Sequence, residues 1–338
     1  KKPGVTSTIT FVTQIGKWFS KSWWNPDQES SLDLSGNSDG KKIQVAGNYA
    51  YIIRDDNDPD FVVVDISDTS APTQVGSLAL DGDPNDVFVS GDYAYVASSD
   101  DSEELQIVSI STPSSPSLAG SLNIPGNQDA SGVYVVGSKA YITSWWDHEF
   151  TVVDVSTVSS PSIDGSINLS DDVNEVVVTG DYAYLASDNS EELHIIDIST
   201  PSSPTNIGWL DLPTNLDGIS VAVLDDTIFL AQNNLIRSID ITNRTSPSLS
   251  DSLDLGNTIT DIALEFGIND TRMYVSTTDN SAELQVVDIT DPSDISLLWT
   301  LDISSDDDQQ WVAYSDTLDR AFVVGVSDGQ ELTIVEPN

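Results

Sequence analysis

Residues 85–124 read NDVFVSGDYAYVASSDDSEELQIVSISTPSSPSLAGSLNI, and they contain four short segments of β-strand character. The segments are DVFVSG, YAYVAS, LQIVSIS and AGSLNI, in which apolar residues alternate or form short β-branched runs. A Gly-Asp pair at 91–92 separates the first two segments and is typical of a tight hairpin. Pro and Ser residues at 112–117 separate the last two. The stretch therefore predicts a four-stranded antiparallel unit.

The same unit recurs along the whole chain. An aromatic position returns about every 45 residues, at Tyr51, Tyr95, Tyr141, Tyr184, Phe229, Tyr274 and Phe322. A second, mostly acidic position follows it in each unit, at Asp65, Ser109, Asp154, Asp197, Asp240, Asp288 and Glu336. Units of about 40 to 45 residues with four strands each are typical of β-propeller blades. Both markers predict seven blades.

The two ends of the repeat array complement each other. The seventh unit stops at its third strand, within residues 333–338, and lacks a fourth. A matching fourth strand, SSLDLSGN at 30–37, stands before the first unit and resembles GSLNIPGN at 120–127. We therefore predict an all-β, seven-bladed propeller over residues 28–338, closed by an N-terminal strand that completes the last blade. Such a joint removes the open sheet edges of an unclosed array. Residues 1–27 form a separate N-terminal extension.

The repeat resembles a known family. HIIDIST at 194–200 and QVVDITD at 285–291 are similar to the central strand of the LVIVD repeat, a propeller-forming repeat of bacterial and archaeal surface proteins. The similarity runs from residue 28 to the end of the chain. The fifth and seventh units depart most from it, because Arg237-Ser238 interrupts the apolar run and the last unit ends in Glu-Pro. The resemblance implies the propeller fold and an exported or surface location, without a defined activity.

Composition excludes several classes of function. The 338 residues include 12 Lys+Arg against 55 Asp+Glu, which gives a net charge of −43. This field would repel a phosphate backbone, so nucleic acid is not an expected partner. The absence of cysteine excludes disulfides and thiolate metal sites. No apolar run reaches the roughly 18 residues of a transmembrane segment.

The acidic surface also indicates a setting. At about 1 M salt the screening length is roughly 3 Å, so the self-repulsion of such a surface is weakened there. We expect a salt-adapted (halophilic) protein located outside the cell or on its surface. A removed signal peptide or a trimmed start would each account for a chain that begins at Lys1.

Acidic loops are predicted to gather on one face of the ring. The loops between the second and third strands and those between blades emerge on the same side, and both sets are rich in Asp and Glu. Asp56, Asp58 and Asp60 alternate as in a calcium loop, although the Gly and the distal Glu of an EF-hand are missing. Calcium is the candidate cofactor there. A solvated acidic rim without bound metal is the favoured alternative.

Three further carboxylates, Asp86, Glu175 and Asp261, begin the inner strands at equivalent positions and could point into the central channel. Paired carboxylates can perform acid–base chemistry, but such residues more often hold adjacent blades together through backbone hydrogen bonds. The two histidines, loop residue His148 and strand-surface residue His194, are not equivalent. They predict neither a Ser-His-Asp site nor a histidine metal site. We expect a protein that is not an enzyme.

Two other features are candidates for recognition or modification. Trp145 and Trp146 interrupt a loop whose sister loops are purely polar, and exposed aromatics of this kind stack on glycans or anchor a protein partner. Folding of both rings over the rim is the alternative. Asn168, Asn243 and Asn269 begin glycosylation sequons.

The extension differs in charge from the rest of the chain. Residues 1–27 hold four lysines and one aspartate, a net +3, so the remaining residues carry −46. The Val- and Thr-rich residues 5–13 favour a strand, although a helical spacing is also present. We predict that the extension contacts a partner through Val5, Ile9, Phe11, Trp18, Phe19, Trp23 and Trp24.

Several functions follow from these features. The favoured hypothesis is a structural subunit of a head-to-tail surface filament, in which the basic arm self-associates as a donor strand on a neighbouring acidic propeller. The alternative is a monomeric adhesion or ligand-binding propeller that uses its acidic loop face. A polysaccharide-active enzyme and a membrane-surface tether through the arm are less favoured.

Overall fold

The computed structural model describes residues 26–35, 39–55, 59–100, 102–126, 129–145, 149–169, 171–188, 191–212, 216–265, 271–303, 309–326 and 329–337. Every regular element among these residues is a β-strand. The same residues include no helix with the length and hydropathy needed to cross a bilayer.

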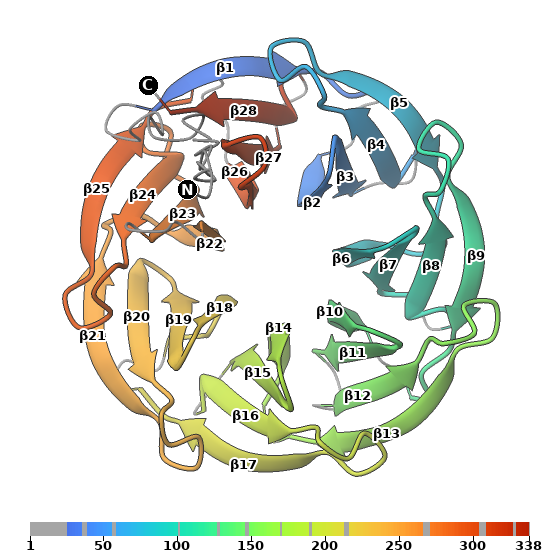
Figure 1. The fold of residues 1–338 in the computed structure, drawn as a ribbon, viewed down its shortest axis with the longest axis vertical. Coiled ribbons are helices and arrows are strands. Elements are labelled where there is room, and N and C mark those ends of the chain that lie inside the picture. Colours follow the sequence, from blue (N-terminus) through green and yellow to red (C-terminus); the bar gives the residue numbers. More distant parts are fainter. Residues whose placement is uncertain are drawn as a thin grey trace, which may run out of the picture.

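Twenty-eight strands form seven antiparallel sheets of four strands each, arranged around one axis (Figure 1). In each of the first three blades the strands run outward from the axis in chain order. Blade 1 holds β2 (Gly40–Ala46), β3 (Tyr49–Arg54), β4 (Phe61–Asp65) and β5 (Thr73–Leu78). Blade 2 holds β6 (Pro84–Ser90), β7 (Tyr93–Ser98), β8 (Leu105–Ser109) and β9 (Ser117–Leu122). Blade 3 holds β10 (Ala130–Val136), β11 (Lys139–Ser144), β12 (Glu149–Asp154) and β13 (Ser162–Asn168).

The next three blades have the same order. Blade 4 holds β14 (Val173–Thr179), β15 (Tyr182–Ser187), β16 (Leu193–Asp197) and β17 (Thr205–Leu210). Blade 5 holds β18 (Ser220–Leu224), β19 (Thr227–Gln232), β20 (Leu235–Asp240) and β21 (Ser248–Asp254). Blade 6 holds β22 (Ile259–Glu265), β23 (Arg272–Thr277), β24 (Leu284–Asp288) and β25 (Ser296–Leu301). The predicted fold class and repeat count are confirmed.

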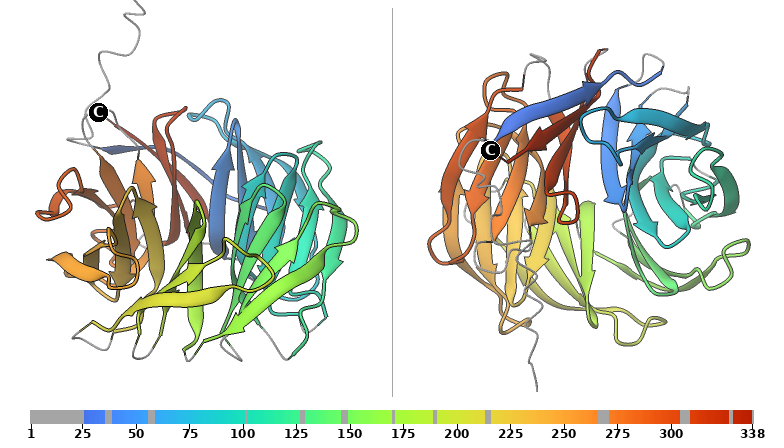
Figure 2. Two further views of the ribbon diagram at one scale, coloured as in Figure 1. Left: turned by 60° about the horizontal axis from the view of Figure 1, so that its bottom comes forward. Right: turned by 45° about the horizontal axis from the view of Figure 1, so that its top comes forward.

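Blade 7 closes the ring with strands from both ends of the chain. It contains β26 (Gln309–Ser315), β27 (Arg320–Gly325), β28 (Leu332–Glu336) and, on the outside, β1 (Asp27–Leu32). β1 lies beside β28, as the blue and red ribbons of Figure 2 show. Strand pairing places Leu32 opposite Leu332. Arg320 connects three strands of this sheet, because it reaches Glu29 at 2.5 Å and Glu336 at 3.2 Å. Closure by an N-terminal strand is therefore confirmed, with the strand beginning a little earlier than SSLDLSGN.

The hydrophobic core lies between neighbouring blades. At the closing joint, Leu34 follows β1 and packs in one cluster with Ile43 and Ile52 of blade 1 and with Phe322 and Val324 of blade 7. The backbone N–H of Leu34 donates to Oε2 of Glu331 at 2.8 Å. Each sheet thus has apolar side chains on both faces, so the third strand of a blade is an apolar run instead of an alternating pattern.

The acidic marker of the repeat ends the third strand of a blade. Oδ1 of Asp154 accepts the backbone N–H of Ser156 at 2.8 Å, and Oδ1 of Asp197 accepts that of Ser199 at 2.9 Å. A carboxylate that bonds the backbone two residues later forms an Asx turn, which directs the chain out of the strand. The predicted Gly-Asp hairpin is also present, with φ of 60° at Gly91.

The closing joint gives a first test. We expect Leu34→Ala to lower the free energy of unfolding by about 2 to 5 kcal/mol, because Leu34 is 1% exposed and its loss leaves a cavity between the first and last blades. Leu118→Ala is the matched control, since Leu118 on outer strand β9 is 46% exposed and should cost under about 0.5 kcal/mol. Urea denaturation measures both, and equal effects would contradict a structural role for the joint.

Candidate functional site in the central channel

The innermost strand of each blade places one residue at the same register position near its start. Strand pairing gives the equivalence, since Asp86 lies opposite Ala97 and Glu175 lies opposite Ala186. Around the ring the seven residues are Lys42, Asp86, Gly132, Glu175, Ser220, Asp261 and Trp311. This position has the same backbone geometry in every blade, but its side chain is a carboxylate in three blades and a lysine, glycine, serine or tryptophan in the others.

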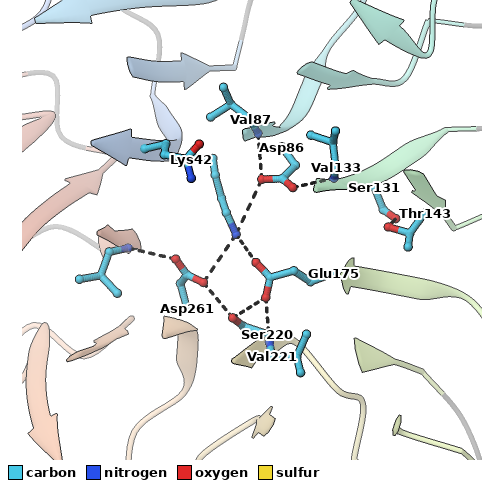
Figure 3. Close-up of polar contacts among 12 residues, drawn as sticks. Lys42, Asp86, Val87, Ser131, Val133, Thr143, Glu175, Ser220, Val221 and Asp261 are labelled. Atoms are coloured by element: carbon cyan, nitrogen blue, oxygen red, sulfur yellow. Dashed lines mark hydrogen bonds and ion pairs between the residues drawn. The ribbon is translucent and has the colours of Figure 1, made fainter. Parts of the chain in front are cut away.

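Lys42 reaches across the channel to three carboxylates (Figure 3). Its Nζ lies 2.6 Å from Oε1 of Glu175, 3.6 Å from Oδ1 of Asp261 and 4.0 Å from Oδ1 of Asp86. The four side chains come from blades 1, 4, 6 and 2, so a single ammonium joins parts of the ring that are distant in sequence. The prediction that these three carboxylates point into the channel is confirmed.

The same carboxylates hold the next blade through its backbone. Asp86 accepts the N–H of Val133 at 2.8 Å on blade 3, and Glu175 accepts that of Val221 at 2.8 Å on blade 5. Asp261 accepts the N–H of Val312 on blade 7 at 3.2 Å. Ser220 adds hydrogen bonds to Glu175 at 2.6 Å and to Asp261 at 2.9 Å. The expected structural role, a bond from one blade to the next, is confirmed at all three positions.

Burial and charge act against each other in this cluster. Burial raises the pKa of Asp86 to about 6 although Lys42 opposes the shift, and burial likewise raises the pKa of Asp261 to about 7. Burial alone would lower the pKa of Lys42, but Asp261, Glu175 and Asp86 together raise it above its ordinary value. The ammonium is therefore permanently charged at neutral pH and is the counter-ion of the carboxylates.

The cluster lies where two cavities meet. A cavity of about 330 Å³ on the side of the inter-blade loops and a second of about 230 Å³ on the other side both include Lys42, Glu175 and Asp261 in their walls. The larger cavity is also lined by Asn85, Trp145, Asn174, Asp188, Asp217 and Trp311. We call this larger cavity the channel mouth. Its lining holds five carboxylates and a single lysine, together with two indole rings.

Asn174 organises one wall of the channel mouth. Its Oδ1 accepts the indole N–H of Trp145 at 2.9 Å. Its amide nitrogen donates to Oδ1 of Asp188 at 2.6 Å and to the carbonyl of Gly218 at 2.7 Å. Burial raises the pKa of Asp188, and repulsion from Asp217 adds to the shift. This carboxylate therefore lies in a negative field that a cation would relieve.

Other predicted site residues are placed as follows. Trp145 is partly buried and lines the channel mouth, while Trp146 lies outside the described residues. Asp60 is buried and its Oδ2 accepts the N–H of Leu80 at 2.9 Å, whereas Asp56 and Asp58 lie outside the described residues. Calcium binding at this loop stays a prediction.

The predicted glycosylation sites and the residues of the N-terminal arm also fall partly inside and partly outside the described residues. Asn168 and Asn243 are exposed, and Oδ1 of Asn243 accepts the N–H of Thr245 at 3.3 Å. Asn269 lies outside the described residues. So do the predicted partner-binding residues of the arm, namely Val5, Ile9, Phe11, Trp18, Phe19, Trp23 and Trp24.

The sequence did not predict a structural role for the buried glutamates that precede the third strands of several blades. Oε2 of Glu104 accepts the backbone N–H of Ile124 at 2.7 Å, and Oε2 of Glu192 accepts that of Leu212 at 2.8 Å. Glu283 and Glu331 repeat the contact in blades 6 and 7. These side chains belong to the loops that composition assigns to an acidic rim. Their position directly before the third strand of blades 2, 4, 6 and 7 is the sequence signal that could have distinguished them from solvated carboxylates.

The fold and the channel define a class of protein, namely a closed seven-bladed β-propeller. Its repeat has an Asx turn after the third strand, in sequences such as Asp-Ile-Ser. Within that class the chain belongs to the LVIVD repeat family, whose repeat matches residues 37–79, 81–124, 127–168, 171–211, 217–254 and 273–303. The resemblance inferred from HIIDIST and QVVDITD is thus confirmed. The seventh blade lies outside the matches.

Solved structures share the fold at low identity. The β-propeller domain of Cps50 (Swd1) from Myceliophteria thermophila has a TM-score of 0.71 and 12% identity, covering 93% of this chain and 100% of that one. Virginiamycin B lyase from Staphylococcus aureus has a TM-score of 0.67 and 11% identity, covering 92% and 99%. The computationally designed Ika8 protein has a TM-score of 0.65 and 12% identity, covering 91% and 98%. No curated protein matches the sequence significantly.

The channel cluster gives a second prediction. We expect Lys42→Met to lower the free energy of unfolding by about 3 kcal/mol at pH 8, because it leaves two buried carboxylates, Asp86 and Asp261, and the partly buried Glu175 without their cation. Carboxyl groups whose folded pKa is raised destabilise the fold above that pKa, and protonation below it relieves the strain. The loss should therefore shrink as the pH falls from 8 to 5.

Lys139→Met is the matched control for this variant. Lys139 pairs with Asp154 at 2.7 Å and with Asp164 at 2.5 Å away from the channel, in a partly exposed position. Its loss should cost less than about 1 kcal/mol, with little change between pH 5 and 8. Urea denaturation at both pH values measures each variant, and a Lys42→Met deficit that grows towards acid pH would contradict the assigned charges.

Proposed function

We propose that the chain is a non-enzymatic binding propeller that takes a basic ligand at the channel mouth and operates outside the cell or on its surface. The observation that carries the proposal is the lining of the channel mouth, where five carboxylates face a single lysine beside Trp145 and Trp311. A cation entering this cavity gains electrostatic attraction and contact with indole rings, the two interactions that organic cations use in proteins. The ligand class is therefore an amine or guanidinium group on a small molecule or on a peptide side chain.

The hydrogen bonds of the channel carboxylates support the non-enzymatic part of the proposal. Each of the carboxylates that surround Lys42 also accepts a backbone N–H from the next blade. Both oxygens of each carboxylate already have a partner among Lys42, Ser220 and backbone N–H groups, so proton transfer by one of them would compete with contacts that hold the ring together. Protonation of one of these carboxylates during catalysis would also weaken its contact to the next blade.

The extracellular part rests on charge and on the family. A net charge of −43 suits a medium of high ionic strength, and the LVIVD resemblance implies a surface location. The candidate sequons Asn168 and Asn243 are exposed, as modification would require.

Binding of a tetralysine peptide tests the proposal. We expect Asp188→Asn combined with Asp217→Asn to weaken binding roughly tenfold, about 1.4 kcal/mol, because both carboxylates line the channel mouth. The control is Asp92→Asn with Asp181→Asn, which removes the same amount of charge from two exposed hairpin turns. These turns follow the C-terminal ends of β6 and β14, whereas the channel mouth lies at the N-terminal ends of the same strands. Isothermal titration calorimetry at constant salt measures both. Equal weakening in the two double variants would mean that only net charge attracts the peptide.

The filament hypothesis is a second candidate with its own support. Residues 1–27 carry +3 against −46 for the rest of the chain, so the arm of one copy complements the propeller of another. Exposed apolar residues also recur on the outermost strands, at Leu118, Ile163, Leu249 and Leu297 of β9, β13, β21 and β25. Outer strands with an apolar surface are suitable acceptors for an added strand. Docking of the arm as a donor strand would join copies head to tail.

Removal of residues 1–25 tests this second candidate. The cut leaves β1 intact, because that strand begins at Asp27. We expect polymers of the full chain in negative-stain microscopy and light scattering, and their loss in the shortened chain, at about 0.1 M and at about 1 M salt. A full chain that stays monomeric in both conditions would contradict the filament hypothesis and leave the binding propeller unaffected.

A further inference from the structure

His194 lies at a position that other blades fill differently. The residue belongs to β16 and pairs with Leu185 and Trp209 on the flanking strands. Its side chain is 1% exposed, so the expectation of a strand-surface histidine is wrong. The same register position holds Val62, Gln106, Thr151, Arg237, Gln285 and Thr333 in the other blades.

Two carboxylates face this imidazole. Nε2 of His194 lies 3.6 Å from Oδ2 of Asp171, which precedes β14, and Nδ1 lies 3.6 Å from Oε2 of Glu191, which precedes β16. One donor atom from each of the three side chains can be chosen so that all three lie within 4.8 Å of one another. Neighbouring Asn206 on β17 places its amide nitrogen 3.0 Å from Nδ1.

Three buried polar atoms of this group have no hydrogen-bond partner. They are Nε2 of His194, Oδ2 of Asp171 and Oδ1 of Asn206. Asp171 is only 4% exposed, so water cannot readily compensate for the missing bonds. The 3.6 Å separation of Nε2 and Oδ2 is too long for a hydrogen bond but close to the roughly 3.3 Å between two ligands of a tetrahedral metal ion with bonds of about 2.0 Å.

A sister blade shows how the position is satisfied without a metal. In blade 2, Oε1 of Gln106 accepts the N–H of Asp81 at 3.1 Å, and its amide nitrogen donates to the carbonyl of Asp81 at 2.5 Å. Both the amide oxygen and the amide nitrogen of this glutamine thus bond the loop backbone. Blade 4 has the imidazole of His194 at this position, and the carboxylate of Asp171 faces it. Side chains that can bind a metal ion thus replace the glutamine that bonds the backbone in blade 2.

We propose that Asp171, Glu191 and His194 bind one divalent transition-metal ion of the zinc class. An imidazole with two carboxylates suits such an ion, whereas calcium and magnesium take sets made of oxygen alone. Rotation of the Asn206 amide would turn its orphaned Oδ1 towards the N–H at Nδ1, a second contact that orients the ligating ring. Because Asp171 lies three residues before Asn174, the ion would also anchor the chain segment that enters the channel mouth.

Metal titration of the full chain tests the site. After chelator treatment and at about 1 M NaCl, which suppresses weak binding to surface acids, we expect one Zn²⁺ to bind per chain with higher affinity than any other. Co²⁺ in its place should give the intense visible bands of a tetrahedral site. We expect His194→Gln to weaken Zn²⁺ binding at least about 100-fold, because the loss of a residue that only orients a metal ligand already costs about 10- to 100-fold.

The choice of variant keeps the test decisive. The equivalent residues of blades 2 and 6 are glutamines, Gln106 and Gln285, so we expect the His194→Gln variant to fold. Circular dichroism checks this. The matched control is His148→Gln, which removes the other histidine of the chain and should retain the site and its Co²⁺ bands. Unchanged Zn²⁺ affinity in His194→Gln, loss of the site in His148→Gln, or no saturable site in the wild-type chain would each overturn the proposal.

Discussion

The contact between the ammonium of Lys42 and the carboxylates of Asp86, Glu175 and Asp261 is the interaction on which the channel depends. Without the cation, three carboxylates from blades 2, 4 and 6 would face each other in a confined space. With it, each carboxylate has a cationic neighbour and accepts a backbone N–H from blade 3, 5 or 7. One side chain of blade 1 thereby supports contacts to all the other blades. Removal of charge from water is costly, so the geometry and the additional hydrogen bonds must offset that cost.

The ring accommodates this cluster because the side chains at its seven equivalent positions differ in size and polarity. Gly132 has no side chain, and a Cβ added there would meet Oγ1 of Thr143 at 2.6 Å. Ser220 is small and bonds two of the carboxylates, whereas Trp311 supplies an apolar wall on the side of the channel mouth. A repeat protein gains a site when residues at one geometric position diverge, since the shared backbone holds them in fixed relation. The same reasoning applies to His194, whose counterparts in blades 2 and 6 are glutamines.

The sequence was sufficient for the fold because every blade repeats the same local pattern. Tyr95 and its counterparts are buried at the blade interfaces. The acidic residue forms the turn after the third strand in five blades, at Asp65, Asp154, Asp197, Asp240 and Asp288. The site was predicted only in part. Asp86, Glu175 and Asp261 could be placed in the channel by their register, but Lys42 pairs with residues far along the chain, and the GKKIQV segment gives no sign of that partnership. Charge patterns likewise could not distinguish a buried carboxylate such as Glu192, which accepts a backbone N–H, from a solvated one.

The scarcity of cations explains why the channel mouth is negative. With 12 Lys+Arg against 55 Asp+Glu, most carboxylates have no basic partner available within the chain. Several of the few basic side chains are used at structural joints: Lys42 in the channel, Arg320 across the closing sheet, and Arg54, which donates to the carbonyls of Ser35 and Pro59 beside the first blade. Salt in the medium can screen the outer surface, but it screens a partly enclosed cavity far less. The channel mouth therefore keeps its negative potential at salt concentrations that screen the rest of the surface, and the basic ligand that we propose would be selected most sharply there.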